Sequence, residues 1–164
     1  MLAVIGAMDQ EVALIRAAMQ VTDEAVHAGI TVSRGSFDGV DIALAKCGIG
    51  KVNAAICTQM LIDLYAPEKL LFSGVAGGLM ANMRAGDLIV ASHLIQFDVD
   101  LTAFGRRHGE LPDVDRMIQS DPALVRAAAD AFDAAFDGAE NPPSLMLGTV
   151  VSGDTFVKDS ETLK

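Results

Sequence analysis

The feature that most constrains the fold is a repeated pattern in which a short apolar run ends at glycine and a helical periodicity follows. Residues 2–5 are apolar and end at Gly6, and apolar residues at helical spacing come next: Val12, Ile15 and Met19. Residues 69–73 form another short apolar run, which leads into Gly74, and residues 145–152 form the last one. Each of these runs has the length and composition of a buried β-strand.

A hairpin signal interrupts this alternation. Residues 30–36 and 40–46 are two β-rich segments joined through Asp38-Gly39, and Asp-Gly is a strong hairpin signal. A helix is expected from about Lys51 to just before Pro67, with four apolar residues on one face: Val52, Ile56, Met60 and Leu64. Strands that alternate with helices, plus one hairpin, predict an α/β three-layer fold with a mixed central sheet.

The second half of the chain continues the alternation. A long β segment is expected from Gly86-Asp87 through Phe97, and the polar stretch 105–115 predicts a mobile loop. Ser120-Asp121-Pro122 has the form of a helix cap with proline at the first helical position. Residues at helical spacing follow this cap: Leu124, Ala128, Ala131 and Ala135.

Composition limits the size and the partners of the protein. The 164 residues are 51% hydrophobic and contain no repeat or linker, so we expect a single domain over residues 1–164. A formal charge of −10 with only 12 Lys and Arg argues against a nucleic acid partner. No apolar stretch approaches the roughly 18 residues that cross a bilayer, and no basic leader precedes the first strand. We therefore expect a cytoplasmic protein without a membrane partner.

Cysteine and histidine give no sign of a metal site. Cys47 and Cys57 belong to no CxxC or Cys/His cluster and are expected to be reduced and buried. The histidines are scattered without ligand spacing, at positions 27, 93 and 108. Neither glycine-rich loop matches the dinucleotide fingerprint or the phosphate loop, so NAD and nucleoside triphosphates are not expected. We predict no metal and no cofactor.

Strand ends followed by glycine or small residues are where open α/β sheets bind small ligands. Glu11 is the carboxylate best placed for chemistry there, because it lies in the first helical turn after a strand. An acidic residue that complements the helix dipole is the alternative interpretation, and the sequence leaves both open. Asp154 is better explained as a turn residue, and Phe156 could stack on a flat ring or pack in the core. Ser73 lacks the GxSxG context of a serine nucleophile.

Five segments, in order along the chain, resemble the signature segments of the bacterial 5'-methylthioadenosine/S-adenosylhomocysteine nucleosidases. They are IGAMDQE at 5–11, CGIGKVNAA at 47–55, SGVAGG at 73–78, DVDLTAFG at 98–105 and VSGDTFV at 151–157. That family has the nucleoside phosphorylase fold and needs neither cofactor nor metal. It hydrolyses the N-glycosidic bond between adenine and a 5'-thio-substituted ribose in methylthioadenosine, S-adenosylhomocysteine and related 5'-deoxyadenosines. The resemblance therefore implies a hydrolase of methionine salvage.

The resemblance also implies a role for individual residues. Glu11 would orient and activate the attacking water, with Met8 against the ribose. The sugar and purine cavity would be lined by Val75, Ala76 and Gly77. Phe156 would stack on adenine, and the backbone of Val157 would bind the edge of the ring.

Other residues would bind the 5' substituent of the nucleoside. Ile49 would border the alkylthio pocket. A neighbouring subunit would complete this pocket with Leu101, Phe104 and Pro112, so the resemblance implies a homodimer. Arg106 and Arg107 stand where bulkier uncharged contacts are expected, which affects how tightly this pocket would close.

The family's catalytic acid is an Asp in a Ser-Asp step, and its ribose-binding Glu lies in a Met-Glu step. Both follow the segment that matches residues 152–157, and this sequence contains neither step there. The expectation is that the chain is the N-terminal portion of the protein and that the fold is incomplete at the C-terminus. A natural truncation without activity is the alternative.

Three function classes remain open. The first is the nucleosidase. The second is a phosphorylase or an aminofutalosine hydrolase of the same fold, although Glu11 would repel a phosphate dianion and no arginine accompanies the early glycine turn. The third is a catalytically inactive protein that binds adenine nucleosides.

Overall fold

The computed structural model describes residues 1–80 and 82–158. The chain forms two compact units, Met1–Ala76 and Gly77–Lys164. Each unit contains a β-sheet with parallel and antiparallel strand pairs, so the predicted α/β class with mixed sheets is confirmed. The prediction that residues 1–164 form one domain stays a prediction. Over the described ranges, no helix combines the length and the apolar character that a membrane span requires.

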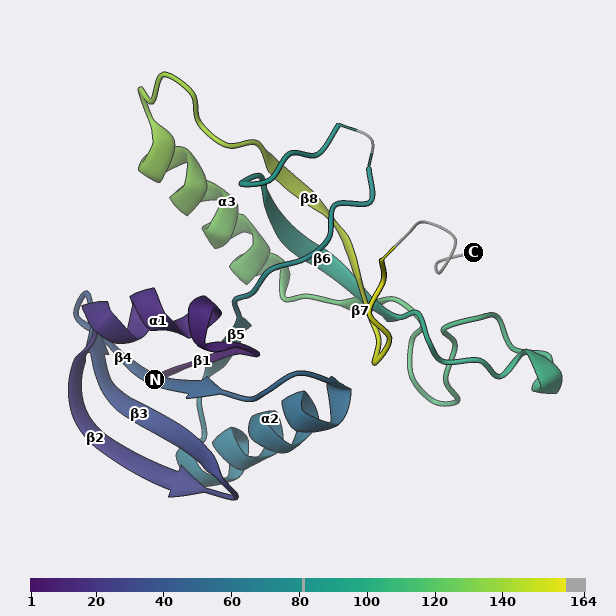
Figure 1. The fold of residues 1–164 in the computed structure, drawn as a ribbon, viewed down its shortest axis with the longest axis horizontal. Coiled ribbons are helices and arrows are strands. Elements are labelled where there is room, and N and C mark those ends of the chain that lie inside the picture. Colours follow the sequence, from purple (N-terminus) through teal and green to yellow (C-terminus); the bar gives the residue numbers. More distant parts are fainter. Residues whose placement is uncertain (81, 159–164) are drawn as a thin grey trace. The chain divides into compact units, whose positions relative to one another are not determined.

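The first unit is a five-stranded sheet in the order β2-β3-β4-β1-β5. β1 is parallel to both of its neighbours, β4 and β5, whereas β3 is antiparallel to β2 and β4. The bounds are Leu2–Gly6 for β1, Gln20–His27 for β2, Ile30–Phe37 for β3, Val40–Lys46 for β4 and Lys69–Phe72 for β5. The helices α1 (Asp9–Ala18) and α2 (Lys51–Tyr65) cover opposite faces of this sheet (Figure 1).

Successive side chains of each strand point to opposite sides of the sheet, so the sheet buries a different set of residues under each helix. In β1, Ala3 and Ile5 point to one side and pack in a cluster that contains Cys57 and Leu61 of α2. Val4 points to the other side, in a cluster with α1 residues. The first unit therefore has three layers, with one helix on each side of the sheet.

The hairpin between β3 and β4 is confirmed at the predicted position. Asp38 and Gly39 have φ of 48° and 79°, the positive values that a two-residue type I′ turn requires at both central positions. β2, which pairs with β3 as an edge strand, was not predicted from the sequence. Most of its residues are exposed, so it lacks the apolar alternation by which a half-buried strand is recognised.

The bounds predicted for α2 are confirmed, but its buried face is not the predicted one. Of the four predicted residues, Val52, Ile56 and Leu64 are exposed and only Met60 is half-buried against the core, whereas Cys57 and Leu61 are the buried residues of the helix. α2 is apolar around much of its circumference, so periodicity alone could not identify the face that meets the sheet.

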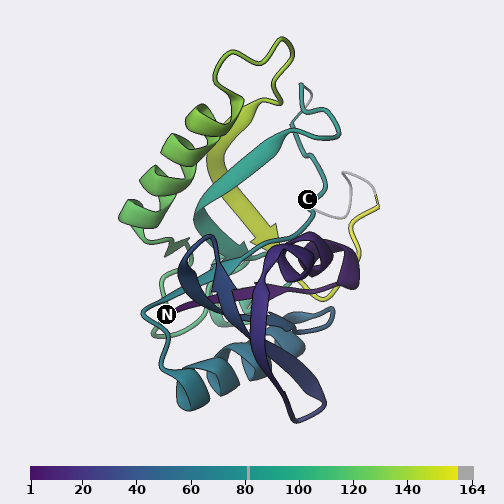
Figure 2. The ribbon, with the colours of Figure 1, turned by 90° about the vertical axis from the view of Figure 1, so that its left-hand side faces the viewer.

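The second unit has a three-stranded sheet in the order β7-β6-β8. β6 (Leu88–Gln96) is parallel to β8 (Leu145–Ser152) and antiparallel to the two-residue β7 (Ile118–Gln119). The helix α3 (Pro122–Phe136) connects β7 to β8 and lies beside β6 (Figures 1 and 2). β6, α3 and β8 match the sequence prediction, while β7 was missed because two residues carry no periodicity.

The loop segments of the second unit also follow local sequence signals. Asp121 caps α3, since its Oδ1 accepts the N–H groups of Ala123 and Leu124 at 2.7 and 3.1 Å. The predicted loop 105–115 contains no helix or strand, and a short 3₁₀ helix, η1 (Thr102–Phe104), precedes it.

Burial identifies the substitution that should damage the first unit most. Leu61 is 0% exposed and Leu14, on α1, is 83% exposed. Leu61→Ala should lower the free energy of unfolding by about 2–5 kcal/mol because it leaves a cavity between α2 and the sheet. Leu14→Ala, the matched control, should change it by less than about 1 kcal/mol. Denaturant unfolding of the full-length protein measures both, and equal losses would contradict the assigned buried face of α2.

Candidate active site

The parallel strands of the first unit bring three chain segments to one edge of the sheet. β4, β1 and β5 run in the same direction and are neighbours in that order, so their carboxyl ends lie together. Backbone pairing continues to these ends: Cys47 N–H donates to Gly6 O and Ser73 N–H to Ile5 O, both at 2.9 Å. Open α/β sheets bind small ligands at this kind of edge.

Glu11 lies at this edge and accepts three backbone hydrogen bonds. The N–H groups of Ala7 and Met8 donate to its Oε2 at 2.7 and 2.9 Å. The N–H of Val75, which follows β5, donates to Oε1 at 2.9 Å. One oxygen therefore holds the turn that precedes α1, and the other holds the segment after the neighbouring strand.

The turn contacts make Glu11 an N-terminal cap of its own helix. Met8 is the N-cap residue of α1 and Glu11 is the third helical residue, so its carboxylate reaches back to the N-cap N–H as in a capping box. The alternative interpretation, in which Glu11 stabilises the start of its helix, is thus correct for Oε2. It does not account for Oε1, whose donor is 64 residues away in the sequence.

Two glycines make the space that this carboxylate occupies. A Cβ at Gly74 would lie 2.8 Å from Glu11 Oε1 and 2.8 Å from the ring of Phe72. A Cβ at Gly6 would lie 2.7 Å from Val12 Cγ1 and 3.1 Å from Glu11 Cβ. Glycine at these positions allows the close approach that the sequence suggested for the loop after β5.

The opposite end of α1 is fixed to the sheet by a polar cluster. Arg16 donates to Ser33 Oγ at 3.0 Å and to Glu24 Oε1 at 3.1 Å, and Ser33 donates to the same Glu24 oxygen at 2.6 Å. The Ser33 hydrogen bond, and after it the Arg16 guanidinium, hold the pKa of Glu24 below its usual value. The helix that carries Glu11 is therefore attached to the sheet at both ends.

An open cleft of about 510 Å³ lies against the turn that Glu11 holds, with Ala7 and Met8 among its lining residues and Glu11 itself outside them. It is lined by residues that follow β1 and residues at or after the end of β4, namely Ala7, Met8, Asp9, Gln10, Lys46, Gly48, Ile49 and Asn53. Ile49 is 73% exposed, and its carbonyl accepts a hydrogen bond from Asn53 Nδ2 at 2.7 Å. Gly48 has a φ of 87°, which favours glycine at the bend. The cleft therefore has apolar walls at Met8 and Ile49 and a loop held in place by Asn53.

The two cysteines are free and buried, as predicted. Burial raises the pKa of Cys47, and the nearby Glu11 carboxylate raises it further, although a hydrogen bond donated by its own backbone N–H opposes this. Burial also raises the pKa of Cys57 to about 11. Both thiols are therefore protonated near neutral pH, so neither has the thiolate character of a nucleophile. In residues 1–80 and 82–158, no three His, Cys, Asp or Glu side chains are grouped so as to hold a metal ion.

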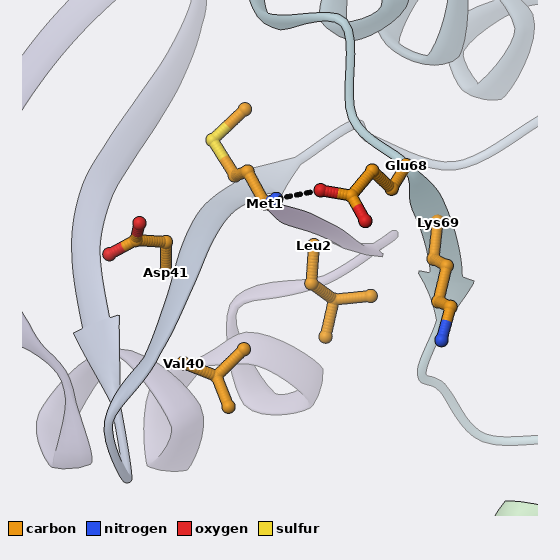
Figure 3. Close-up of a pocket in the computed structure, with 6 residues that line it drawn as sticks. All are labelled: Met1, Leu2, Val40, Asp41, Glu68 and Lys69. Atoms are coloured by element: carbon orange, nitrogen blue, oxygen red, sulfur yellow. Dashed lines mark hydrogen bonds and ion pairs between the residues drawn. The ribbon is translucent and has the colours of Figure 1, made fainter.

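A smaller pocket of about 260 Å³ lies at the amino ends of the same strands. Figure 3 shows the residues that line it, Met1, Leu2, Val40, Asp41, Glu68 and Lys69, and the hydrogen bond from the amino group of Met1 to Glu68. Because ligands of open α/β sheets bind outside the carboxyl ends of the strands, we do not assign the active site to this pocket.

The other predicted site residues lie in the second unit or immediately before it. Ala76 ends the first unit and Gly77 begins the second, both exposed. Phe156 and Val157 follow the carboxyl end of β8. The ring of Phe156 is 88% exposed, so the alternative that it packs in the core is wrong for the described structure.

The residues expected to serve a neighbouring subunit form one stretch around η1. Phe104 N–H donates to Leu101 O at 2.9 Å, and the Phe104 side chain is 82% exposed. Pro112 is also exposed. Arg106 and Arg107 pair with Glu110, at 3.2 and 3.1 Å, so their charges are directed to a neighbour within the loop.

Sequence and structure agree on part of the site. The structure brings Met8, Glu11 and Val75 together through hydrogen bonds, and Ile49 lines the same cleft as Met8. Sequence reasoning missed Asn53 and the N–H of Ala7. The Ala7 N–H could not have been found, because residue spacing does not identify backbone donors. Asn53 could have been found, because it lies near the start of a helix and shortly after a glycine turn.

Comparison with known proteins identifies the family to which the chain belongs. The chain matches the family model described as the phosphorylase superfamily over residues 1–164. It is 40% identical over 162 residues to a 5'-methylthioadenosine/S-adenosylhomocysteine nucleosidase of Geobacillus kaustophilus, covering 99% of this chain and 67% of that protein. The chain belongs to the phosphorylase superfamily and, within it, to the 5'-methylthioadenosine/S-adenosylhomocysteine nucleosidase family. It spans about two thirds of the length of the curated relatives that it matches.

Solved structures show the same similarity. A Neisseria meningitidis nucleosidase of this family in complex with methylthio-immucillin-A superposes with a TM-score of 0.90 and 36% identity, over 99% of this chain and 68% of that one. A futalosine hydrolase mutant of Helicobacter pylori strain 26695 superposes with a TM-score of 0.87 and 32% identity, over 98% of this chain and 71% of that one. The predicted fold is therefore confirmed.

Gly74→Ala should displace the Glu11 carboxylate, because the added methyl group would overlap with Oε1. We expect a loss of about 1–3 kcal/mol in the free energy of unfolding and a crystal structure in which Oε1 no longer accepts from Val75. Gly148→Ala is the control, since its nearest contact would be an ordinary 3.7 Å. A Gly74→Ala structure with the Val75 hydrogen bond intact would contradict this account.

Proposed function

We propose that the full-length protein is a nucleosidase that hydrolyses the N-glycosidic bond of 5'-methylthioadenosine and S-adenosylhomocysteine, releasing adenine and the thioribose. The observation that carries this proposal is the Glu11 carboxylate, held by three backbone N–H groups beside an open cleft at the carboxyl edge of the sheet. The family to which the chain belongs supports the same activity.

The hydrogen bonds indicate what Glu11 does. An ionised carboxylate has about four acceptor positions, two on each oxygen. Ala7 and Met8 occupy those of Oε2, and Val75 occupies one on Oε1. We propose that the attacking water binds at another position on Oε1, where Glu11 would orient it and deprotonate it as it attacks the anomeric carbon.

The reaction also needs a proton donor for the leaving adenine, because adenine takes the electron pair of the broken bond and develops negative charge while the sugar becomes oxocarbenium-like. From the resemblance, we expect this role to belong to an Asp in a Ser-Asp step downstream of residues 152–157. The described residues therefore provide the water-activating half of the mechanism.

The remaining contacts are proposed from the same resemblance. Met8 packs against the ribose and Ile49 borders the alkylthio group, which is consistent with their place in one cleft. Residues 75–77 line the nucleoside cavity. Phe156 stacks on adenine, supported by its exposed ring, and the backbone of Val157 binds the ring edge.

We also propose that the protein is a cytoplasmic homodimer that acts in methionine salvage. Leu101, Phe104 and Pro112 would complete the alkylthio pocket of the partner subunit. Phe104 is 82% exposed, so its side chain is accessible to a partner subunit, as this proposal requires.

Aminofutalosine is a second candidate substrate. Its adenine and ribose could use the same contacts, and the Helicobacter pylori protein described as a futalosine hydrolase has the same fold as this chain. A comparison of turnover with aminofutalosine and methylthioadenosine would separate the two.

Glu11→Gln tests the assignment of the base. The amide has one acceptor oxygen, but donors face both carboxylate oxygens, so the substitution loses hydrogen bonds as well as the base. We expect turnover of methylthioadenosine to fall about 10²- to 10⁴-fold and the free energy of unfolding to fall by about 1–3 kcal/mol. Steady-state kinetics and denaturant unfolding of the full-length protein measure these effects.

Asp121→Ala is the matched control for capping. It removes a side-chain acceptor at the N-terminus of α3, which should cost about 0.5–2 kcal/mol in stability while turnover stays near normal. If Glu11→Gln behaved like this control, with reduced stability and normal turnover, Glu11 would be only a helix cap.

If the protein is a hydrolase and not a phosphorylase, it should release adenine in the absence of phosphate. The Glu11 carboxylate would repel a phosphate dianion. Among the described residues that line the cleft, Lys46 is the only cation, and Asp9 lies 2.9 Å from it. Adenine release from methylthioadenosine in phosphate-free buffer should therefore proceed at the full rate, with free thioribose as the second product. A rate that rose in proportion to added phosphate, with a sugar 1-phosphate as product, would make the protein a phosphorylase.

A further inference from the structure

The rim of the cleft beside Glu11 has a pair of opposite charges. Lys46, at the end of β4, places its Nζ 2.9 Å from Asp9 Oδ1 and 3.0 Å from Oδ2, at the start of α1. Both side chains line the cleft that Met8 and Ile49 also line. They are 47% and 80% exposed, and ion pairs in water contribute little to stability. Fold stability alone therefore gives a weak reason for charges at this place.

The two proposed substrates differ only in what the ribose 5'-sulfur carries. Methylthioadenosine has an uncharged methyl group there. S-adenosylhomocysteine has an amino acid tail that ends in an ammonium and a carboxylate. A rim that presents one carboxylate and one ammonium is complementary to such a zwitterion, because each tail charge can face its opposite in a charge-assisted hydrogen bond.

The positions of the pair agree with this match. Asp9 is adjacent to Met8, which is proposed to contact the ribose, and Lys46 is three residues before Ile49, which is proposed to border the alkylthio group. A tail that leaves the ribose past Ile49 would therefore reach the rim. The four-carbon stem of Lys46 is flexible enough to move from Asp9 to a carboxylate of the ligand.

We propose that Lys46 and Asp9 form the subsite for the zwitterionic amino acid tail of the substrate, with Asp9 on the ammonium and Lys46 on the carboxylate. This inference rests on the proposed function. The subsite acts on selectivity among 5' substituents and takes no part in breaking the glycosidic bond.

A purely structural role gives a different expectation. If the ion pair only attached the end of β4 to α1, its loss would disturb the whole cleft, and every substrate would be affected alike. The ratio of kcat/KM values between substrates separates the two roles, because a general disturbance cancels in the ratio.

The test uses the full-length protein with three nucleosides: S-adenosylhomocysteine, methylthioadenosine and 5'-butylthioadenosine, which has a tail without charge. In Lys46→Met and in Asp9→Asn, the kcat/KM ratio of S-adenosylhomocysteine to methylthioadenosine should fall about 5- to 20-fold, mainly through KM. The ratio of the butyl substrate to methylthioadenosine should keep its wild-type value. Lys46→Arg, which retains the charge, should restore most of the lost selectivity.

Lys69→Met is the matched control, since Lys69 lines the pocket at the amino ends of the strands and should not affect selectivity. In wild type, higher salt should also lower the S-adenosylhomocysteine ratio, because exposed charges are screened. An unchanged ratio in both rim variants, or an equal loss on all three nucleosides, would overturn the subsite while the proposed function stands. Failure of the wild-type protein to release adenine from any of them would overturn the proposed function, and the subsite with it.

Discussion

The Glu11 carboxylate links the segments that follow two neighbouring strands, β1 and β5. Its Oε2 binds the turn after β1, and its Oε1 binds the segment after β5. Since β1 and β5 are parallel neighbours, both segments start from the same edge of the sheet, and one side chain can reach both. These three hydrogen bonds hold the turn before α1 and orient the Glu11 carboxylate.

This arrangement reconciles the two interpretations that the sequence left open. A cap needs one acceptor, and Glu11 has a second oxygen that the cap does not use. The structure therefore establishes the capping role without weakening the proposed chemical role. Gly74 supports this view, because the close approach of Oε1 to the segment after β5 is unnecessary for capping alone.

How well the sequence predicted each element depends on how local its cause is. The Asp38-Gly39 hairpin and the Asp121 cap are determined by residues a few positions apart, and both were predicted correctly. The buried face of α2 is determined by contact with the sheet, so the sequence pattern indicated the wrong face. Glu11 could be found from its place after a strand, but its bond to Val75 joins residues 64 positions apart, which only the fold brings together.

The position of β1 between β4 and β5 also separates two proposed tasks within the candidate site. On the β5 side, the loop provides a backbone donor that fixes the Glu11 carboxylate. On the β4 side, the residues at and after the strand end form the cleft wall with Lys46 and Ile49. Under the proposed function, changes on the β4 side would therefore alter which 5' substituent is accepted without moving the carboxylate that is proposed to activate water. A sheet with β1 at its edge would have only one neighbouring loop, and the same residues would have to serve both tasks.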